Sequence, residues 1–377
     1  MEVDYDEIRP YKDSEVSHAI KRLSTHPWLI TGIKKIKFKN SPKFLNHLIT
    51  LGIKIYVKIK LYPIKTINDF QIKIAANSVL APILKKTSDS LTWSGLEKLD
   101  PKKPYLFISN HRDIVLDPAV VNYILAVNNF SIGQIAFGDN LLINDFVSDL
   151  IRLNKAFIVK RNLTPKSQLK ASILLSEYIH TVLFEEKSSI WIAQREGRAK
   201  DGNDRTNPAL IKMLNLHFRR KKQPFHTLTE TYNIVPVSIS YEFDPCDVLK
   251  AKELYIKQNG EKYQKEKDED LISMTTGITG RKGRIHVSFS EPIKDNFDSE
   301  NLLVKSIDES IHLNYKLWPT NYLGYDLANN TNKYSKEYDT SLREKFMKRF
   351  LELSDSERNI AYSTYAMPVI NKKGYST

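Results

Sequence analysis

The feature that most restricts the fold of this chain is an alternation of short apolar runs with longer helical patterns between residues 93 and 293. Strands that alternate with helices are typical of layered α/β domains whose sheet is largely parallel. The runs that favour strands are 105–109, 134–137, 156–160, 190–193, 234–241 and 284–289. The stretches that favour helices are 118–128, 141–151, 166–185 and 208–221. The sequence therefore predicts an α/β fold with a mostly parallel sheet flanked by helices.

The parts of the chain on either side of this alternation have a different character. Residues 1–92 are predicted to be mostly helical, and residues 296–377 are predicted to form a helical, polar C-terminal extension of the α/β domain at 93–295. Residues 246–275 are charged and favour an exposed helix or lid. Residues 51–62 largely alternate apolar and polar side chains, which is the periodicity of a strand. That stretch is either an edge strand or a segment that lies at a membrane interface.

The basic residues are unevenly placed along the chain. The net charge is +13, and between Glu15 and Asp69 there are eleven basic residues and no acidic one. Aromatic and aliphatic residues are interleaved with them, a mixture that suits an anionic lipid surface. The same mixture would also suit RNA, or the solvated face of an ordinary packed element. We expect residues 16–68 to dock on an anionic membrane, and we disfavour nucleic acid as a partner.

Missing features narrow the classes of function. Cys246 is the only cysteine, which excludes an internal disulfide and a cysteine-based metal site and fits a reducing compartment best. The first residues are acidic and no apolar run has the length of a membrane span, so neither a signal peptide nor a transmembrane helix is expected. A Gly-rich phosphate loop, a His-Glu-x-x-His motif and a Gly-x-Ser-x-Gly elbow are also missing. We expect a cytoplasmic protein, peripheral on the inner face of a membrane, without a metal centre or a covalent serine intermediate.

The strongest chemical signal follows the predicted strand at 105–109. His111 comes just after the end of that strand, where the ligands of open α/β sheets collect. Asp113 and Asp117 follow, and Asp117 with Pro118 would cap the next helix. An imidazole with a carboxylate on its second nitrogen is a general base with a fixed tautomer. The alternative is an ordinary loop histidine beside a helix cap.

This turn resembles the first motif of the glycerolipid acyltransferase family, which includes glycerol-3-phosphate and lysophosphatidic acid acyltransferases. That family carries Asn-His, four residues and then Asp, usually followed by Pro. Here five residues separate His111 from Asp117, so the turn holds one extra residue. We favour Asp117 as the partner of the imidazole, because the following Pro and helix match the family, and Asp113 is the alternative.

Three later stretches match further motifs of the same family. They occur in the family's order, at 156–162, 190–198 and 234–239. The third motif is one residue shorter between Gly197 and its basic residue, so Lys200 is an alternative to Arg198 in the family's Arg position. Pro236, inside the fourth motif, restricts that strand to a sheet edge or a bulge. The resemblance to the family covers roughly residues 93–293.

The resemblance implies an O-acyltransferase in which His111 is the general base and Asp117 orients it. The acceptor would be held by Lys160, Arg161, Glu196, Gly197 and Arg198. Arginine forks bind phosphate well, which suits a phosphate-bearing acceptor, although surface charge is the alternative for the basic residues. Residues 93–295 would then be the acyltransferase domain. The donor would be acyl-CoA or an acidic acyl carrier protein, with no other cofactor and no metal.

The expected reaction moves a fatty acyl group from this thioester to a glycerol-phosphate type acceptor in phospholipid synthesis. The first choice of acceptor is 1-acyl-glycerol-3-phosphate. Glycerol-3-phosphate, another lysolipid and an amino-lipid are the alternatives. Two readings come from other classes: a lipid hydrolase that uses water as the acceptor, and a non-enzymatic lipid- or nucleic-acid-binding protein driven by residues 16–68.

Overall fold

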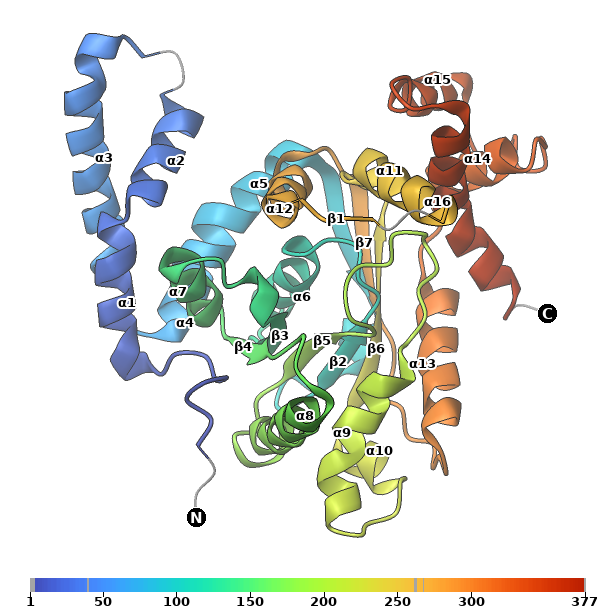
Figure 1. Ribbon diagram of the computed structural model, residues 1–377, viewed down its shortest axis with the longest axis horizontal. Coiled ribbons are helices and arrows are strands. Elements are labelled where there is room, and N and C mark those ends of the chain that lie inside the picture. Colours follow the sequence, from blue (N-terminus) through green and yellow to red (C-terminus); the bar gives the residue numbers. More distant parts are fainter. Residues whose placement is uncertain (1–3, 39–40, 261–262, 267, 376–377) are drawn as a thin grey trace. The chain divides into compact units, whose positions relative to one another are not determined.

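The computed structural model describes residues 4–38, 41–260, 263–266 and 268–375 (Figure 1). Contacts between Cα atoms divide the chain into two compact units. The smaller unit comprises Met1–Val79 and Ile132–Leu174, and the larger unit comprises Leu80–Ser131 and Leu175–Thr377. The functional boundaries predicted at 92 and 295 stay predictions.

The described residues of the larger unit form five strands that lie side by side. In spatial order they are β1 (Ser88–Ser94), β7 (Gly283–Phe289), β6 (Ile234–Tyr241), β2 (Leu106–Ser109) and β5 (Ile190–Ala193). β1 pairs in parallel with β7, and β2 pairs in parallel with both β6 and β5. The junction of β6 with β7 is antiparallel. All residues of β2 and β6 are buried, as expected for strands covered on both faces.

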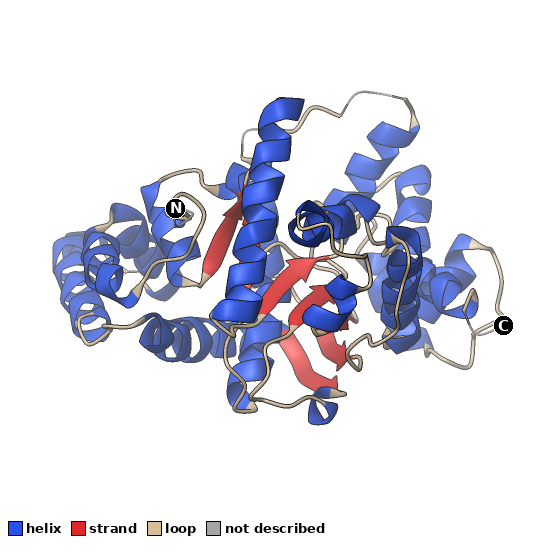
Figure 2. Ribbon diagram, turned by 90° about the horizontal axis from the view of Figure 1, so that it is seen from below, coloured by secondary structure: helices blue, strands red, loops and turns tan. Residues whose placement is uncertain are grey.

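Helices surround these strands (Figure 2). Helix α13 packs on β6 and on α9, and α16 packs on α14 and α11. The helices of the larger unit are α5 (Ala81–Thr87), η3 (Leu96–Lys98), α6 (Leu116–Val127), η5 (Thr181–Glu185), α9 (Pro208–Arg220), α10 (Thr227–Thr231), α11 (Asp247–Gln258), α12 (Glu269–Thr279), α13 (Glu300–Asn314), α14 (Pro319–Ala328), α15 (Thr340–Lys348) and α16 (Asp355–Lys373). Helix α8 (Pro165–His180) contains the boundary between the two units.

The smaller unit combines helices with one parallel pair of strands, β3 and β4. Its elements are α1 (Asp13–Thr25), α2 (Pro27–Lys37), η1 (Lys43–Leu45), α3 (Asn46–Leu61), α4 (Ile67–Asp69), η2 (Phe70–Leu80), β3 (Gln134–Gly138), η4 (Asp139–Leu141), α7 (Asp145–Leu153) and β4 (Ala156–Val159). Glu15 helps to begin α1, because its carboxylate accepts a hydrogen bond from the backbone N–H of Lys12 at 2.6 Å. No helix within the described residues is long and apolar enough to cross a membrane.

Most of the stretch at 51–62 belongs to helix α3, so the edge-strand reading of that stretch is wrong. Ile53, Val57 and Leu61 recur every four residues, and all three are buried in a core that α1 and α2 share. This spacing places the three side chains on one face of a helix. Burial of that face outweighs the strand-like alternation of the sequence.

The prediction of an α/β fold with a mostly parallel sheet flanked by helices is confirmed. All six predicted strands are present at nearly the predicted bounds. The sequence did not reveal β1, which lies at the edge of the sheet and is largely exposed. Its only apolar side chains are those of Leu91 and Trp93, so it lacks the apolar run that marked the other strands.

Pro236 lies in β6, between β2 and β7, so the expected position at an edge or bulge is wrong. It pairs with Ile108 of β2, and the ladder with β7 begins one residue later, where Val237 pairs with Phe289. The Pro236 carbonyl accepts a hydrogen bond from the backbone N–H of Ser290 at 3.0 Å. Proline has no N–H with which to return this bond, and the paired register with β7 begins at the next residue.

Candidate active site

A short turn, residues 110–115, connects β2 to helix α6 and contains His111. We call it the His111 turn. Nδ1 of His111 lies 2.8 Å from Oδ2 of Asp117, a residue of the first turn of α6. The Asp117 side chain is fully buried, whereas that of His111 is 13% exposed. Nε2 of His111 has no hydrogen-bond partner among the described residues. The pair thus presents one free imidazole nitrogen to a reacting group.

Three further donors hold the Asp117 carboxylate. Oδ2 accepts hydrogen bonds from the backbone N–H groups of Arg112 at 2.6 Å and Asp113 at 2.9 Å. Oδ1 accepts one from the hydroxyl of Tyr241, at the end of β6, at 2.8 Å. These bonds compensate for the burial of the carboxylate and fix its orientation toward the imidazole. Sequence reasoning missed Tyr241, which lies beyond the fourth motif and carries no local signal.

Asn110 joins the start of the His111 turn to β6. Its side-chain amide donates to the carbonyl of Ile239 at 3.0 Å and its side-chain oxygen accepts from the N–H of Ile239 at 2.7 Å. The side chain therefore continues the pairing of β2 with β6 by one more residue. This explains why an asparagine precedes the histidine, because an amide supplies both a donor and an acceptor.

Asp113 starts helix α6 and does not contact His111. Its Oδ1 accepts hydrogen bonds from the backbone N–H groups of Val115 at 2.9 Å and Leu116 at 2.8 Å. Burial, and next the charge of Asp117, raise the pKa of Asp113. The prediction that Asp117 caps α6 is wrong, because the helix begins at Leu116 and Asp113 makes the capping bonds. The Asp117 carboxylate therefore does not cap the helix and bonds to the imidazole instead.

Helix α12 packs closely against the His111 turn at Gly277. A Cβ atom at this position would lie 2.0 Å from Oδ2 of Asp113. No side chain fits there unless the helix or the turn moves, so a glycine allows the close approach of the two elements.

A network of charged side chains bonds to the His111 turn. Arg112 is buried and donates from Nη2 to Oδ2 of Asp204 at 2.6 Å. Nζ of Lys250, on α11, donates to the Arg112 carbonyl at 2.8 Å and pairs with Asp244. Burial acts to raise the pKa of Asp244, but Lys250 outweighs it and the pKa is lowered. Of these residues, only Arg112 lies within a sequence motif. Asp204, Asp244 and Lys250 belong to segments that are distant in the sequence, so the motifs did not indicate them.

The C-terminal helices complete this buried network. Tyr365 on α16 donates its hydroxyl to Oδ2 of Asp247 at 2.8 Å and accepts from the N–H of Asp244 at 2.8 Å. Nε of Arg349 donates to the same Asp247 oxygen at 2.9 Å. Asp204, Asp244 and Asp247 thus each have a cationic partner, as buried charges require.

The third motif places its residues at the end of β5. Glu196 is exposed, and Gly197 adopts a left-handed backbone with φ of +71° and open space where a Cβ would lie. Nη1 of Arg198 donates to Oγ of Ser273, on α12, at 2.6 Å. The backbone N–H of the next residue, Ala199, donates to the His111 carbonyl at 2.9 Å. The motif is therefore bonded to the His111 turn.

The alternative basic residue, Lys200, is already engaged. It pairs with Glu253 on α11, and burial lowers the pKa of Lys200. Arg198 makes no ion pair with a described residue, so it is the better of the two to receive an anion.

The second motif lies in the smaller unit. Lys160 pairs with Glu7, and the backbone N–H of Arg161 donates to Oδ2 of Asp139 at 3.3 Å. The guanidinium group of Arg161 lies close to Gly138, where a Cβ atom would be 2.6 Å from Cζ. The expected role of both basic residues in holding the acceptor stays a prediction. In the described part of the chain, no group of three His, Cys, Asp or Glu side chains is suited to a metal ion.

Tyr241→Phe should slow the chemistry that depends on His111 without unfolding the protein. Loss of one hydrogen bond to the charged carboxylate should lower kcat by about threefold to tenfold. The KM values of donor and acceptor should change little, because Tyr241 acts through Asp117. Tyr232→Phe is the matched control, since its buried hydroxyl bonds to His180 at 3.3 Å and not to Asp117. An unchanged kcat in Tyr241→Phe would rule out this positioning role.

Comparison with known proteins shows which family this part of the chain resembles. Residues 90–240 match the family model described as Acyltransferase. This match and the similar proteins described next confirm the predicted resemblance to glycerolipid acyltransferases.

The relatives that match are larger proteins. A "Glycerol-3-phosphate acyltransferase" of Pseudomonas fluorescens (strain SBW25) is 27% identical over 248 residues, which are 63% of this chain and 27% of the relative. One of Ectopseudomonas mendocina (strain ymp) is 28% identical over 190 residues, which are 50% of this chain and 21% of the relative. The chain thus spans about a quarter of the length of these curated relatives. Among solved structures, the 1-acyl-sn-glycerophosphate acyltransferase PlsC from Thermotoga maritima matches with a TM-score of 0.40 and 13% identity, covering 78% of this chain and 91% of that chain.

Proposed function

We propose that the chain is an O-acyltransferase that moves a fatty acyl group from a thioester to a hydroxyl of a glycerol-phosphate type acceptor. The observation that carries the proposal is the His111–Asp117 pair, whose free Nε2 lies on the turn after β2. The names of the curated relatives support a phosphate-bearing acceptor. We keep 1-acyl-glycerol-3-phosphate as the first choice, with glycerol-3-phosphate, other lysolipids and amino-lipids as alternatives, and acyl-CoA or acyl carrier protein as the donor.

In the proposed reaction, transfer is direct within a complex of enzyme, donor and acceptor. Nε2 of His111 accepts the proton of the acceptor hydroxyl as the oxygen attacks the carbonyl carbon of the thioester. The tetrahedral intermediate then expels the thiolate of the donor, which takes the proton from the imidazolium and leaves as a thiol. Asp117 stabilises the imidazolium between these steps. The acyl group passes from sulfur to oxygen without an acyl-enzyme.

An assay with a labelled acyl donor and a panel of acceptors tests this proposal. We expect label in an ester product that depends on both the acceptor and the enzyme, with phosphate-bearing acceptors preferred over their dephosphorylated analogues. Acyl-CoA and acyl carrier protein would be compared as donors. Release of free fatty acid at the same rate with and without an acceptor would instead establish a hydrolase. A preference for dephosphorylated acceptors would contradict the glycerol-phosphate assignment.

Helix α3 supports the proposal that the protein works at a membrane surface. Its exposed apolar side chains recur at three- and four-residue intervals, on a different face from the buried core residues. They are Leu48, Leu51, Ile55 and Ile59, followed by Tyr62 just after the helix. Exposed lysines at 54, 58 and 60 accompany them. An exposed apolar stripe with lysines suits an anionic lipid surface, and we propose the inner, cytoplasmic face of a membrane.

Sedimentation with liposomes should show binding that rises with the fraction of anionic lipid and falls with salt. Ile59→Glu should weaken this binding by about tenfold or more, because it removes an apolar contact with the lipid and adds repulsion from the anionic surface. Leu351→Glu is the matched control, since Leu351 and Ile59 are both 67% exposed. Equal binding to neutral liposomes would contradict the electrostatic account. Tighter binding to RNA than to anionic liposomes would favour nucleic acid as the partner.

A further inference from the structure

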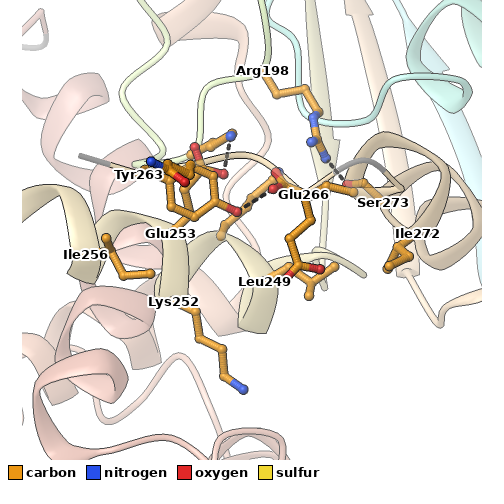
Figure 3. Close-up of a pocket in the computed structure, with 13 residues that line it drawn as sticks. Arg198, Leu249, Lys252, Glu253, Ile256, Tyr263, Glu266, Ile272 and Ser273 are labelled. Carbon is orange, nitrogen blue, oxygen red and sulfur yellow. Dashed lines mark hydrogen bonds and ion pairs between the residues drawn. The ribbon is translucent and has the colours of Figure 1, made fainter. Parts of the chain in front are cut away.

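A pocket of about 540 Å³ lies in the larger unit, between α11, α12 and the stretch after β5 (Figure 3). Cavities of this volume bind small organic molecules. The third motif contributes Arg198 and Lys200 to its wall, α11 contributes Leu249 and Glu253, and α12 contributes Ser273. The motifs alone identified only the first two of these residues.

The walls of this pocket are bonded to the His111 turn. Ala199, in the third motif, donates its backbone N–H to the His111 carbonyl at 2.9 Å. Lys250, a wall residue on α11, donates to the Arg112 carbonyl at 2.8 Å. The pocket is therefore held beside the turn whose imidazole would activate the acceptor hydroxyl.

The basic side chains of the pocket differ in whether a carboxylate neutralises them. Lys200 pairs with Glu253, and Lys250 pairs with the partly buried carboxylate of Asp244. Arg198 makes no ion pair within the described part of the chain, and its Nη1 donates to the Ser273 hydroxyl at 2.6 Å. Arg198 and Ser273 together form a cation and a hydroxyl that can bind an anionic group.

Two acidic side chains of the pocket wall also lack an ion pair with any described residue. They are Glu266 and Glu269. Glu269 accepts a hydrogen bond from the hydroxyl of Tyr263 at 2.5 Å. Lys252 does not neutralise them, and in Figure 3 its side chain extends away from Glu253 and Tyr263. A ligand with an anionic group alone would leave these carboxylates unmatched and repelling it, whereas a ligand that also carries an ammonium would match both charges.

We propose that this pocket receives the headgroup of the acyl acceptor and that this headgroup is zwitterionic. Its anionic group, a phosphate or a carboxylate, binds Arg198 and Ser273, and its ammonium lies near Glu266 and Glu269. The proposal rests on the proposed function and narrows it, moving the preference from a bare phosphate monoester to a lysolipid or amino-lipid whose headgroup ends in an amine.

Soluble headgroup analogues test the pocket without any turnover. Their binding to the full chain would be measured by NMR titration with sn-glycero-3-phosphoethanolamine, Nα-acetylornithine, glycerol 3-phosphate and glycerol. We expect a zwitterionic analogue to bind more tightly than glycerol 3-phosphate, and glycerol not to bind measurably. The first two analogues distinguish a phosphate from a carboxylate as the anionic group.

Three variants locate that binding in the pocket. Arg198→Ala should weaken binding of every anionic analogue by about tenfold or more. Glu269→Gln should reduce the preference for an amine by up to about fivefold and leave glycerol 3-phosphate unchanged or slightly tighter. Leu249→Trp should fill the pocket and exclude the larger headgroups while sparing glycerol 3-phosphate. Arg281→Ala is the matched control and should change nothing, because Arg281 is outside the pocket wall and pairs with Asp89.

The two proposals fail in different ways. Tighter binding of glycerol 3-phosphate than of both zwitterionic analogues would overturn the headgroup assignment, even if acyl transfer is observed. Binding that Arg198→Ala does not weaken would overturn it as well. If the zwitterionic analogues bind as expected but no acceptor is acylated, the proposed function fails and the pocket remains a site for a zwitterionic ligand.

Discussion

His111→Ala should lower the rate of acyl transfer by about 10²–10⁴-fold, the usual contribution of a positioned general base. The loss should appear in kcat, because alanine leaves the pocket walls and the buried carboxylate in place. Donor binding and the midpoint of thermal unfolding should change little. The measurement is a steady-state assay at saturating donor and acceptor, with unfolding followed by circular dichroism.

His226→Ala provides the matched control for this variant. His226 precedes α10, is half-buried, and donates or accepts no side-chain hydrogen bond that involves the proposed site. Its replacement should leave the rate unchanged. If folded His111→Ala kept the full rate of transfer, the imidazole would not be the base and the proposed reaction would be refuted.

Asp117→Asn should lower kcat by roughly 10²-fold or more, because a neutral amide cannot stabilise the imidazolium and favours the wrong tautomer of the ring. The geometry should survive, since the amide oxygen can still accept from the backbone groups that now bind the carboxylate. The loss should appear in kcat, with the KM values of donor and acceptor little changed. A crystal structure or an unfolding curve of the variant would check that the turn is intact.

Asp113→Asn separates the two carboxylates of the turn. Asparagine keeps the oxygen that accepts from Val115 and Leu116, so the rate should change little. Because burial raises the pKa of Asp113 in the folded state, the carboxyl costs stability as the pH rises above its unfolded pKa, and the full cost is present above its folded pKa. Asp113→Asn should therefore unfold at the same or a higher temperature at neutral pH. If Asp113→Asn lost more activity than Asp117→Asn, the assigned partner of His111 would be the wrong one.

The local parts of this fold could be predicted because local patterns determine them. The run at 105–109 predicted β2, and the residues after it predicted a turn with an imidazole beside a carboxylate. The proline and the helix that follow favoured Asp117 over Asp113, and the hydrogen bond at 2.8 Å agrees with that choice. The reason given for the choice was partly wrong, because Asp113 makes the capping bonds. Both aspartates lie near the start of α6, and only the structure shows which one caps the helix and which one contacts His111.

The rest of the site depends on contacts between segments that are far apart in the sequence. Tyr241 is 124 residues from Asp117, and Asp204 is 92 residues from Arg112. No period or spacing marks such pairs, since a buried tyrosine or aspartate looks the same in a sequence whether or not it supports a catalytic turn. The pocket wall formed by α11 and α12 was likewise recognised only as a charged helix or lid. The close approach of α12 to the His111 turn depends on Gly277, and the sequence does not show which of its glycines allows such a contact.

The hydrogen bond from the backbone of Asp244 to Tyr365 joins residues that are 121 positions apart. A growing chain makes the segment that holds His111 and Asp117 long before it makes that tyrosine. Until Arg349 and then α16 have been made, Asp247 lacks the guanidinium and the hydroxyl that bind it in the folded protein. Loops that close over such lengths are slow to form, because their entropy is lost before the contacts are gained. The buried network behind His111 and Asp117 is therefore completed only after α16 has been made, long after those two residues.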